Sequence, residues 1–253
     1  MSMTNETYDV ALHRAAQYLA TFGKNFCESK EDDSHTNLEW VVGDHLLRSR
    51  EAPGGRQLIL NCEELALQWI GDRPLRLTLA GRTHGEVIVW MHHAAVQNGL
   101  ADYEFHLHYR LPSGPIPHDY VYPRPDAQRA EQVCSYRDNA QRSCEEIRSA
   151  FDLDTEIRVW PHHFDTGAFA KLTGYAIGYG LAVPDTVIDS YYLYVSAYRD
   201  DESVDPSHFP PLDMGEWRSG EFTGAVCSVT DLSSQDHARF LKEAIEQFQK
   251  ALA

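Results

Sequence analysis

Residues 160–165 read WPHHFD, the densest group of side chains in the sequence that are able to do chemistry. The group follows a predicted strand, and neutral histidine and aspartate are good ligands for a divalent transition metal. The same side chains can also exchange protons as a general acid and base. His163 and Asp165 stand two residues apart and so share one side of an extended chain. We therefore predict a metal site at His162, His163 and Asp165. The alternative is a turn in which one histidine bonds a neighbouring loop and Asp165 caps residues 166–172.

A second pair of imidazoles, His106 and His108, lies with Glu104 on one face of a predicted strand. At this spacing the imidazoles are roughly 7 Å apart along the strand, close enough to share a metal ion. Metal-binding double-stranded β-helices use such a pair with a later glutamate, but a proline-containing stretch stands at that place here. The alternative is the solvated face of a half-buried strand.

Tyrosines recur on one face of the predicted strand 191–198. A row of phenol rings can line a ligand-binding cleft, because the rings stack on a ligand and the hydroxyls orient it. The row can equally be the half-buried face of a central strand. The candidate ligand-binding residues, taken with those of the WPHHFD segment, are Trp160, His163, Tyr192, Tyr194 and Tyr198.

Other patterns that carry chemistry are weak or missing. The sequence has no zincin, P-loop, nucleophile-elbow or EF-hand pattern. His92 and His93 diverge by about 100° within a predicted helix, so they do not share a ligand. The glycines at 174, 178 and 180 lie in an aromatic strand that no helix follows, so we expect them to let tyrosines pack or another backbone approach.

The composition excludes several classes of protein. The chain has 253 residues, of which 43% are hydrophobic, enough for one large or two small folded domains. Its 22 basic and 38 acidic side chains give a net charge of −16. A nucleic-acid binder or a protein of anionic membrane surfaces has a positive footprint, so we expect neither partner. The acidity itself is typical of a soluble protein.

The five cysteines are scattered and contain no CxxC pair, which argues against a disulfide framework and a zinc ribbon. The polar start MSMTNETYDV lacks the pattern of a secretory leader. The apolar stretches are too short to span a membrane. We therefore expect a cytoplasmic protein with no membrane partner, and the sequence indicates no oligomeric state.

Periodicity predicts the elements that position these groups. Helices are expected at residues 8–26, at 86–98 with Thr83 as the cap, at 126–151, and after a cap at Ser233. Short strands are expected at 38–48, 56–60, 63–70, 73–79, 103–111, 155–160, 175–183, 191–198 and 224–230. Because strands mostly follow one another directly, the fold class is α+β, with mainly antiparallel sheets packed by long amphipathic helices.

Five prolines lie within residues 112–125, and proline disfavours both helices and central strands. We therefore predict a linker there, between an N-terminal α+β half at 1–111 and a C-terminal α+β half at 126–253. The order of elements is similar in the two halves, which suggests an internal duplication.

The segments WPHHFD, GYGLAVPD and YYLYVSAY, followed by Glu216-Trp217 and a terminal amphipathic helix, resemble uncharacterised bacterial protein families. In those families a W-x-x-x-F-D element precedes an F/Y-Y-x-Y strand. The resemblance covers about residues 155–253 and implies a bacterial, cytosolic origin without implying a reaction.

Two functions follow from these patterns. The first is a ligand-binding α+β protein, possessing a tyrosine-lined cleft near the WPHHFD segment and taking a small-molecule ligand. The second is a metal-dependent enzyme such as a hydrolase, with His162, His163, Asp165 and either His106 or His108 around a divalent transition metal. An enzyme needs three ligands or an acid–base pair that meet beside an open position, whereas a binding protein needs only a lined pocket.

Overall fold

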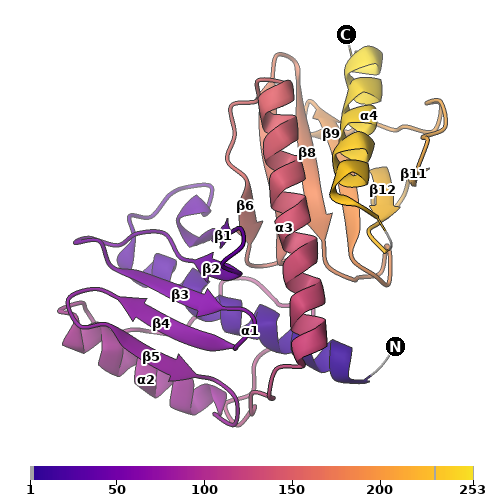
Figure 1. Cartoon of the computed structure of the whole chain (residues 1–253). Helices are drawn as coiled ribbons and strands as arrows, with labels where there is room; N and C mark the ends of the chain where they lie inside the picture. Colours follow the sequence, from indigo (N-terminus) through magenta and orange to yellow (C-terminus); the bar gives the residue numbers. More distant parts are fainter. Residues whose placement is uncertain (1–2, 231, 253) are drawn as a thin grey trace. The chain divides into compact units, whose positions relative to one another are not determined.

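The computed structural model describes residues 3–230 and 232–252 (Figure 1). The chain forms two compact units. Unit 1 holds the residues up to Ser135 together with Val159–His163, and unit 2 holds Tyr136–Arg158 and the residues from Phe164 onwards. Both contain helices and antiparallel strands, so the predicted α+β class is confirmed. The linker at 112–125 and the duplication of two halves stay predictions.

Unit 1 begins with helix α1 (Met3–Phe26), followed by the short 3-10 helix η1 (Ser34–Thr36). The predicted apolar stripe of α1 is buried at Tyr8, Leu12, Ala15, Leu19 and Phe22. In Figure 1 this helix passes behind the sheet of unit 1, and the Phe22 ring lies 5.1 Å from the ring of Trp69. The stripe therefore provides one side of the core of this unit.

The sheet of unit 1 is a five-stranded antiparallel meander whose order follows the chain. Its strands are β1 (Glu39–Val41), β2 (Leu46–Arg48), β3 (Gln57–Asn61), β4 (Ala66–Ile70) and β5 (Leu75–Thr78). The single strand predicted at 38–48 was wrong, because the chain reverses between β1 and β2. Gly43 (φ 81°) and His45 (φ 54°) make that turn in the left-handed region, which glycine adopts easily.

Helix α2 (His84–Gln97) follows β5, and the predicted cap at Thr83 is confirmed. The Thr83 hydroxyl accepts a hydrogen bond from the Glu86 N–H, and the Glu86 carboxylate accepts one from the Thr83 N–H. These two bonds satisfy donors that the first turn of a helix leaves open.

The strand predicted at 103–111 was wrong, although this segment alternates in burial as a strand does. The backbone of this segment forms hydrogen bonds with a side chain, and these take the place of bonds to a neighbouring strand. Asn25 of α1 donates from Nδ2 to the Glu104 carbonyl and accepts from the Glu104 N–H at Oδ1. The amide of one side chain thus occupies groups that a strand ladder would use.

Residues 118–122 pack along the start of α2. The N–H groups of Gly81, His84 and Gly85 donate to the carbonyls of residues 122, 120 and 118. The proline-containing stretch is therefore bonded into unit 1 through its own backbone.

Helix α3 (Ala127–Ala150) begins in unit 1 and continues into unit 2. The strands that follow are β6 (Arg158–Trp160), β7 (Asp165–Leu172), β8 (Tyr175–Ala182), β9 (Tyr192–Arg199), β10 (Glu202–Ser203), β11 (Glu216–Arg218) and β12 (Gly224–Ser228). Their sheet has the order β11-β12-β9-β8-β7-β6, with β10 paired to β9.

Strand β7 corrects the alternative in which Asp165 caps residues 166–172, because this segment is extended and pairs along its whole length with β8. Gly167 and Gly180 face each other in that pairing, and a Cβ on Gly180 would lie 2.1 Å from the Thr166 carbonyl oxygen. The expectation that a glycine here lets another backbone approach is therefore confirmed.

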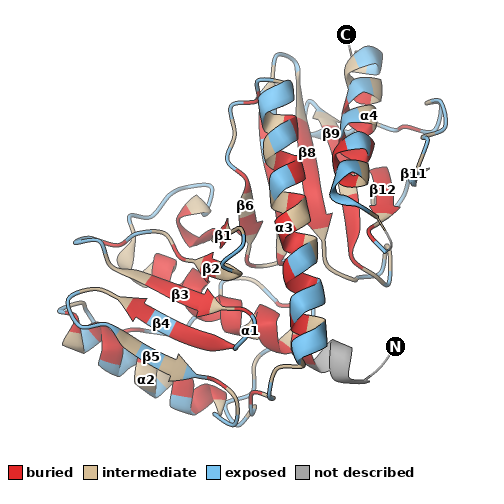
Figure 2. Cartoon of the chain, in the orientation of Figure 1, coloured by how far each residue is buried: buried red, intermediate tan, exposed pale blue. Residues whose placement is uncertain are grey.

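Helix α4 (Ser234–Leu252) closes unit 2. The stripe predicted for this helix is buried at Phe240, Leu241, Ala244, Ile245 and Phe248, whereas Leu252, which also belongs to it, is half-buried (Figure 2). Among the described residues, no helix is both long and apolar enough to cross a membrane.

Candidate functional site

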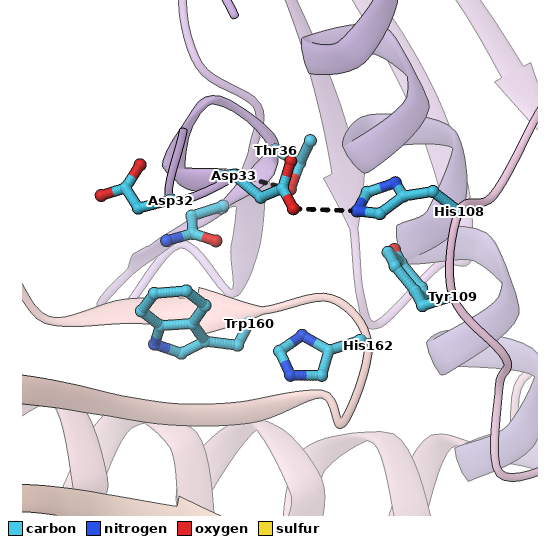
Figure 3. Close-up of a pocket in the computed structure, with 8 residues that line it drawn as sticks. Asp32, Asp33, Thr36, His108, Tyr109, Trp160 and His162 are labelled. Carbon is cyan, nitrogen blue, oxygen red and sulfur yellow. Dashed lines mark hydrogen bonds and ion pairs between the residues drawn. The ribbon is translucent and has the colours of Figure 1, made fainter. Parts of the chain in front are cut away.

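A cavity of about 290 Å³ lies within unit 1 (Figure 3). Its wall combines two carboxylates, two imidazoles and two other aromatic rings with a hydroxyl and an amide. The lining residues are Asp32, Asp33, Thr36, Asn37, His108, Tyr109, Trp160 and His162. Three of them, His108, Trp160 and His162, belong to groups that the sequence singles out for chemistry.

The acidic part of the wall comes from the loop that leads into η1. Asp33 adopts the left-handed conformation (φ 57°), which aspartate tolerates better than most residues. The Thr36 hydroxyl donates to the Asp33 carbonyl, and the Ser34 N–H donates to Asp32 Oδ1. Hydrogen bonding from the side chain of Ser34, and then from its backbone N–H, lowers the pKa of Asp32, so its carboxylate is charged at neutral pH.

Asp33 and His108 form an ion-pair contact on one side of the cavity (Figure 3), with 3.1 Å between Asp33 Oδ2 and His108 Nε2. His108 Nδ1 lies 3.5 Å from the Lys24 ammonium, which can only donate. Nδ1 therefore accepts, and Nε2–H donates to Asp33.

The aromatic part of the wall is held by one buried side chain of α1. Gln17 donates from Nε2 to the Pro161 carbonyl (2.9 Å), and its Oε1 accepts from the Tyr109 hydroxyl (2.7 Å). His13 also bonds the Pro161 carbonyl, which leaves the proton on its Nε2. Helix α1 therefore fixes both the WPHHFD turn and Tyr109 relative to the cavity.

His162 lies among aromatic rings. Its ring centroid is 5.8 Å from that of Tyr109, 6.3 Å from that of Trp160 and 4.5 Å from that of His163. Burial lowers the pKa of His162, and the neighbouring imidazoles of His163 and His108 lower it further. His162 is therefore neutral at pH 7 and presents an uncharged ring to the cavity.

Of the three predicted metal ligands, only His162 lines the cavity. His163 is exposed next to His162 in unit 1, and Asp165 belongs to unit 2. Among the described residues, no group of three His, Cys, Asp or Glu side chains has the arrangement of a metal site. His106 is exposed and lies outside the cavity lining. A divalent transition metal stays a prediction, and this geometry gives it no support.

The tyrosine row lies inside unit 2, where its hydroxyls bond carboxylates of the same unit. Tyr192 donates to Asp185 Oδ2 (2.8 Å), and Tyr194 donates to Asp165 Oδ2 (2.7 Å). Burial is the first cause that raises the pKa of both phenols. The Tyr198 ring packs 5.9 Å from that of Phe169. A ligand at the row therefore competes with hydrogen bonds already made, and its binding there stays a prediction.

Sequence reasoning missed the other five lining residues, which are Asp32, Asp33, Thr36, Asn37 and Tyr109. Asp33 stood in a polar loop typical of solvated surface, and Tyr109 was expected on the apolar face of a strand. The signal available for Asp33 was a pair of adjacent acids followed by the short polar residues Ser34, Thr36 and Asn37, which is typical of a structured turn.

Comparisons with protein-family models, curated proteins and solved structures found no match to this chain. The resemblance to bacterial families over residues 155–253 therefore stays a prediction. What the site can do follows from its own chemistry, which combines carboxylates with aromatic faces and imidazoles.

Proposed function

We propose that this protein binds a small ligand through a positively charged amino group, in the cavity of unit 1. The observation that carries the proposal is the pairing of the Asp33 carboxylate with the rings of Trp160 and Tyr109 around one space (Figure 3). A carboxylate supplies charge, and an aromatic face attracts a cation through its quadrupole. Together they are the groups that recognise ammonium ligands.

The charge of the cavity wall favours a cation. Asp32 and Asp33 contribute carboxylates to this wall, and burial lowers the pKa of His162, so that this imidazole adds no positive charge near pH 7. The approach to the cavity is also acidic, because residues 28–33 hold four acids and one lysine. The net charge of −16 adds a long-range field that raises the local concentration of cations.

The size of the cavity limits the ligand. A volume of about 290 Å³ is at the lower end of small-molecule sites, which range from roughly 300 to 1,000 Å³. A short primary or quaternary amine fits, whereas a nucleotide or a peptide of several residues does not. Asn37 and Thr36 add polar contacts that would orient the rest of such a ligand.

The function predicted from the sequence changes in one respect. The WPHHFD segment contributes Trp160 and His162 to the proposed site, and Tyr109 supplies the phenol in place of the row on β9. We retain a cytoplasmic location and the expectation of no nucleic-acid partner. The acidity of the chain opposes binding of phosphate backbones.

The test is a titration with tetramethylammonium, followed by tryptophan fluorescence, in parallel with neutral tert-butanol. We expect saturable quenching by the cation alone, since only the cation gains from the carboxylate. Asp33→Asn should weaken binding about fivefold or more, and Trp160→Leu should remove most of the signal. Asp102→Asn, a matched loss of an exposed aspartate in unit 1, should leave binding unchanged.

Two results would overturn the proposal. One is equal quenching by tert-butanol, which would indicate an apolar site that is indifferent to charge. The other is equal weakening by Asp102→Asn and Asp33→Asn, which would mean that tetramethylammonium responds only to the net charge of the protein.

A further inference from the structure

A second polar cluster lies in unit 1, built from residues that do not line the cavity. It joins α1, the first turn of α2 and the proline-containing stretch through Arg14, His84, Ser113, His118 and Tyr120. The Arg14 guanidinium carbon lies 4.3 Å from the centroid of the Tyr120 ring, and Nη2 donates to the Ser113 carbonyl at 3.3 Å. Stacking on a ring fixes the plane of a guanidinium and aims its remaining donors.

The neighbours of Arg14 in this cluster are a phenol ring, a carbonyl and an imidazole. Among the described residues, no carboxylate lies within ion-pair distance of Arg14. Arg14 Nε and Ser113 Oγ are both buried, and neither has a hydrogen-bond partner within that part of the chain. Buried polar atoms are normally satisfied, so two of them beside one guanidinium indicate a group that is supplied from outside.

Two imidazoles extend the cluster. The His118 ring lies directly against Gly85, where a Cβ would come within 2.2 Å of the ring. His84 is buried beside them, and its Nδ1 accepts a hydrogen bond from the Tyr18 hydroxyl at 2.6 Å. Burial lowers the pKa of His84 to about 4, and electrostatic interactions with His118 and Arg14 lower it further. His84 therefore lies close enough to His118 and Arg14 to interact with both.

The backbone of α2 does not make this site. The N–H groups of His84 and Gly85 bond the carbonyls of Tyr120 and His118, and the Glu86 N–H bonds the cap. Any anion must therefore be recognised by side chains. Arg14 Nε, the Ser113 hydroxyl, the Tyr120 hydroxyl and a ring N–H of His118 are the donors that the cluster offers.

We propose that Arg14, Ser113, His118 and Tyr120 bind a phosphoryl group of a small anionic ligand. Several donors, from α1 and from the proline-containing stretch, suit a tetrahedral group with three or four acceptor oxygens better than a planar carboxylate with two. The site shares no residue with the amine-binding cavity, so it stands or falls independently of the proposed function.

The test uses inorganic phosphate, titrated at constant ionic strength near neutral pH. Binding is followed through the imidazole NMR signals of the protein, with the His118 signal assigned by its loss in His118→Gln. We expect a saturable shift of the His118 and His84 signals. Arg14→Gln should weaken binding about tenfold or more, because a charge-assisted hydrogen bond is lost. Arg73→Gln, which removes an exposed arginine of the same unit, should leave binding unchanged.

Further arms keep the proposal falsifiable. His118→Gln alters an exposed side chain and Tyr120→Phe removes one hydroxyl, so both should fold and both should weaken phosphate binding even where Arg14→Gln is unstable. Acetate at the same ionic strength should produce no saturable shift. Equal binding of acetate, binding that survives in Arg14→Gln and His118→Gln, or no saturable response to phosphate would each overturn the assignment.

Discussion

At the scale of single residues, Arg137 carries the strongest prediction for stability. It is fully buried within unit 2, donates to Thr166 Oγ1 (2.8 Å) and to the Phe164 carbonyl (2.9 Å), and stacks over the Phe164 ring. Phe164 itself has a left-handed backbone (φ 63°), which these contacts help to hold. We expect Arg137→Met to lower the free energy of unfolding by about 3 kcal/mol, because it leaves buried acceptors without donors. Urea unfolding followed by circular dichroism measures this loss.

Arg142→Met is the matched control for that measurement. Arg142 lies on the same helix with a mostly exposed side chain, and it pairs with Asp138. Because the guanidinium of Arg142 is mostly exposed, although Asp138 is buried, this variant should lose clearly less stability than Arg137→Met. Equal losses of unfolding free energy in the two variants would show that the buried contacts of Arg137 contribute no more to stability than the pairing of Arg142 with Asp138.

Arg137, Trp160 and His162 show how far buried and functional residues can be predicted from the sequence alone. Arg137 falls between Val133 and Ala140 on the predicted apolar stripe of its helix, and a charge at such a position is a signal for a buried, bonded arginine. Trp160 and His162 were identified by local density of chemistry. Asp33 was not, because its partner His108 is 75 residues away and only the tertiary fold brings them together.

At the scale of elements, the capping box of α2 is a local device that was predicted from four residues and confirmed. We expect Thr83→Ala to lower the free energy of unfolding by about 1 kcal/mol, because the Glu86 N–H loses its acceptor in the first turn. Thr83→Ser keeps the hydroxyl and should retain most of the stability in the same urea experiment. A loss in Thr83→Ser as large as that in Thr83→Ala would assign the effect to the methyl group.

Elements were predicted well where the signal is local and poorly where it is not. The stripes of α1 and α4 repeat over several turns and specify a helix without reference to partners. Strand alternation at 103–111 was real, yet a strand also needs a neighbouring backbone, and here the Asn25 side chain takes its place. The turn within 38–48 was missed because a strand pattern was followed through Gly43, whose positive φ allows the reversal.

At the scale of the whole molecule, each unit contains a buried histidine that opposes folding in mild acid. Burial lowers the pKa of His84 in unit 1 and of His237 in unit 2 to about 4, from an ordinary value of 6.5. Between those values the unfolded chain binds protons that the folded chain does not, so stability falls as the pH falls from 6.5 toward 4. Each histidine can account for roughly 2–3 kcal/mol of that loss. Hydrogen bonds lower the pKa values of Asp32, Asp205 and Asp236. The stability that these carboxylates contribute is therefore lost only at still lower pH, when they become protonated.

His237 allows this prediction to be tested without sacrificing the fold. Within the described chain neither of its ring nitrogens has a hydrogen-bond partner, so His237→Leu removes unsatisfied polar atoms and should not destabilise the protein near pH 7. The difference in unfolding free energy between about pH 7 and about pH 5 should shrink relative to the parent, since one source of proton uptake on unfolding is gone. His106→Leu, at an exposed position, should leave that difference unchanged. A parent and a His237→Leu variant with the same pH dependence would place the acid sensitivity elsewhere in the molecule, because the imidazole of His237 would then bind protons equally in the folded and the unfolded state.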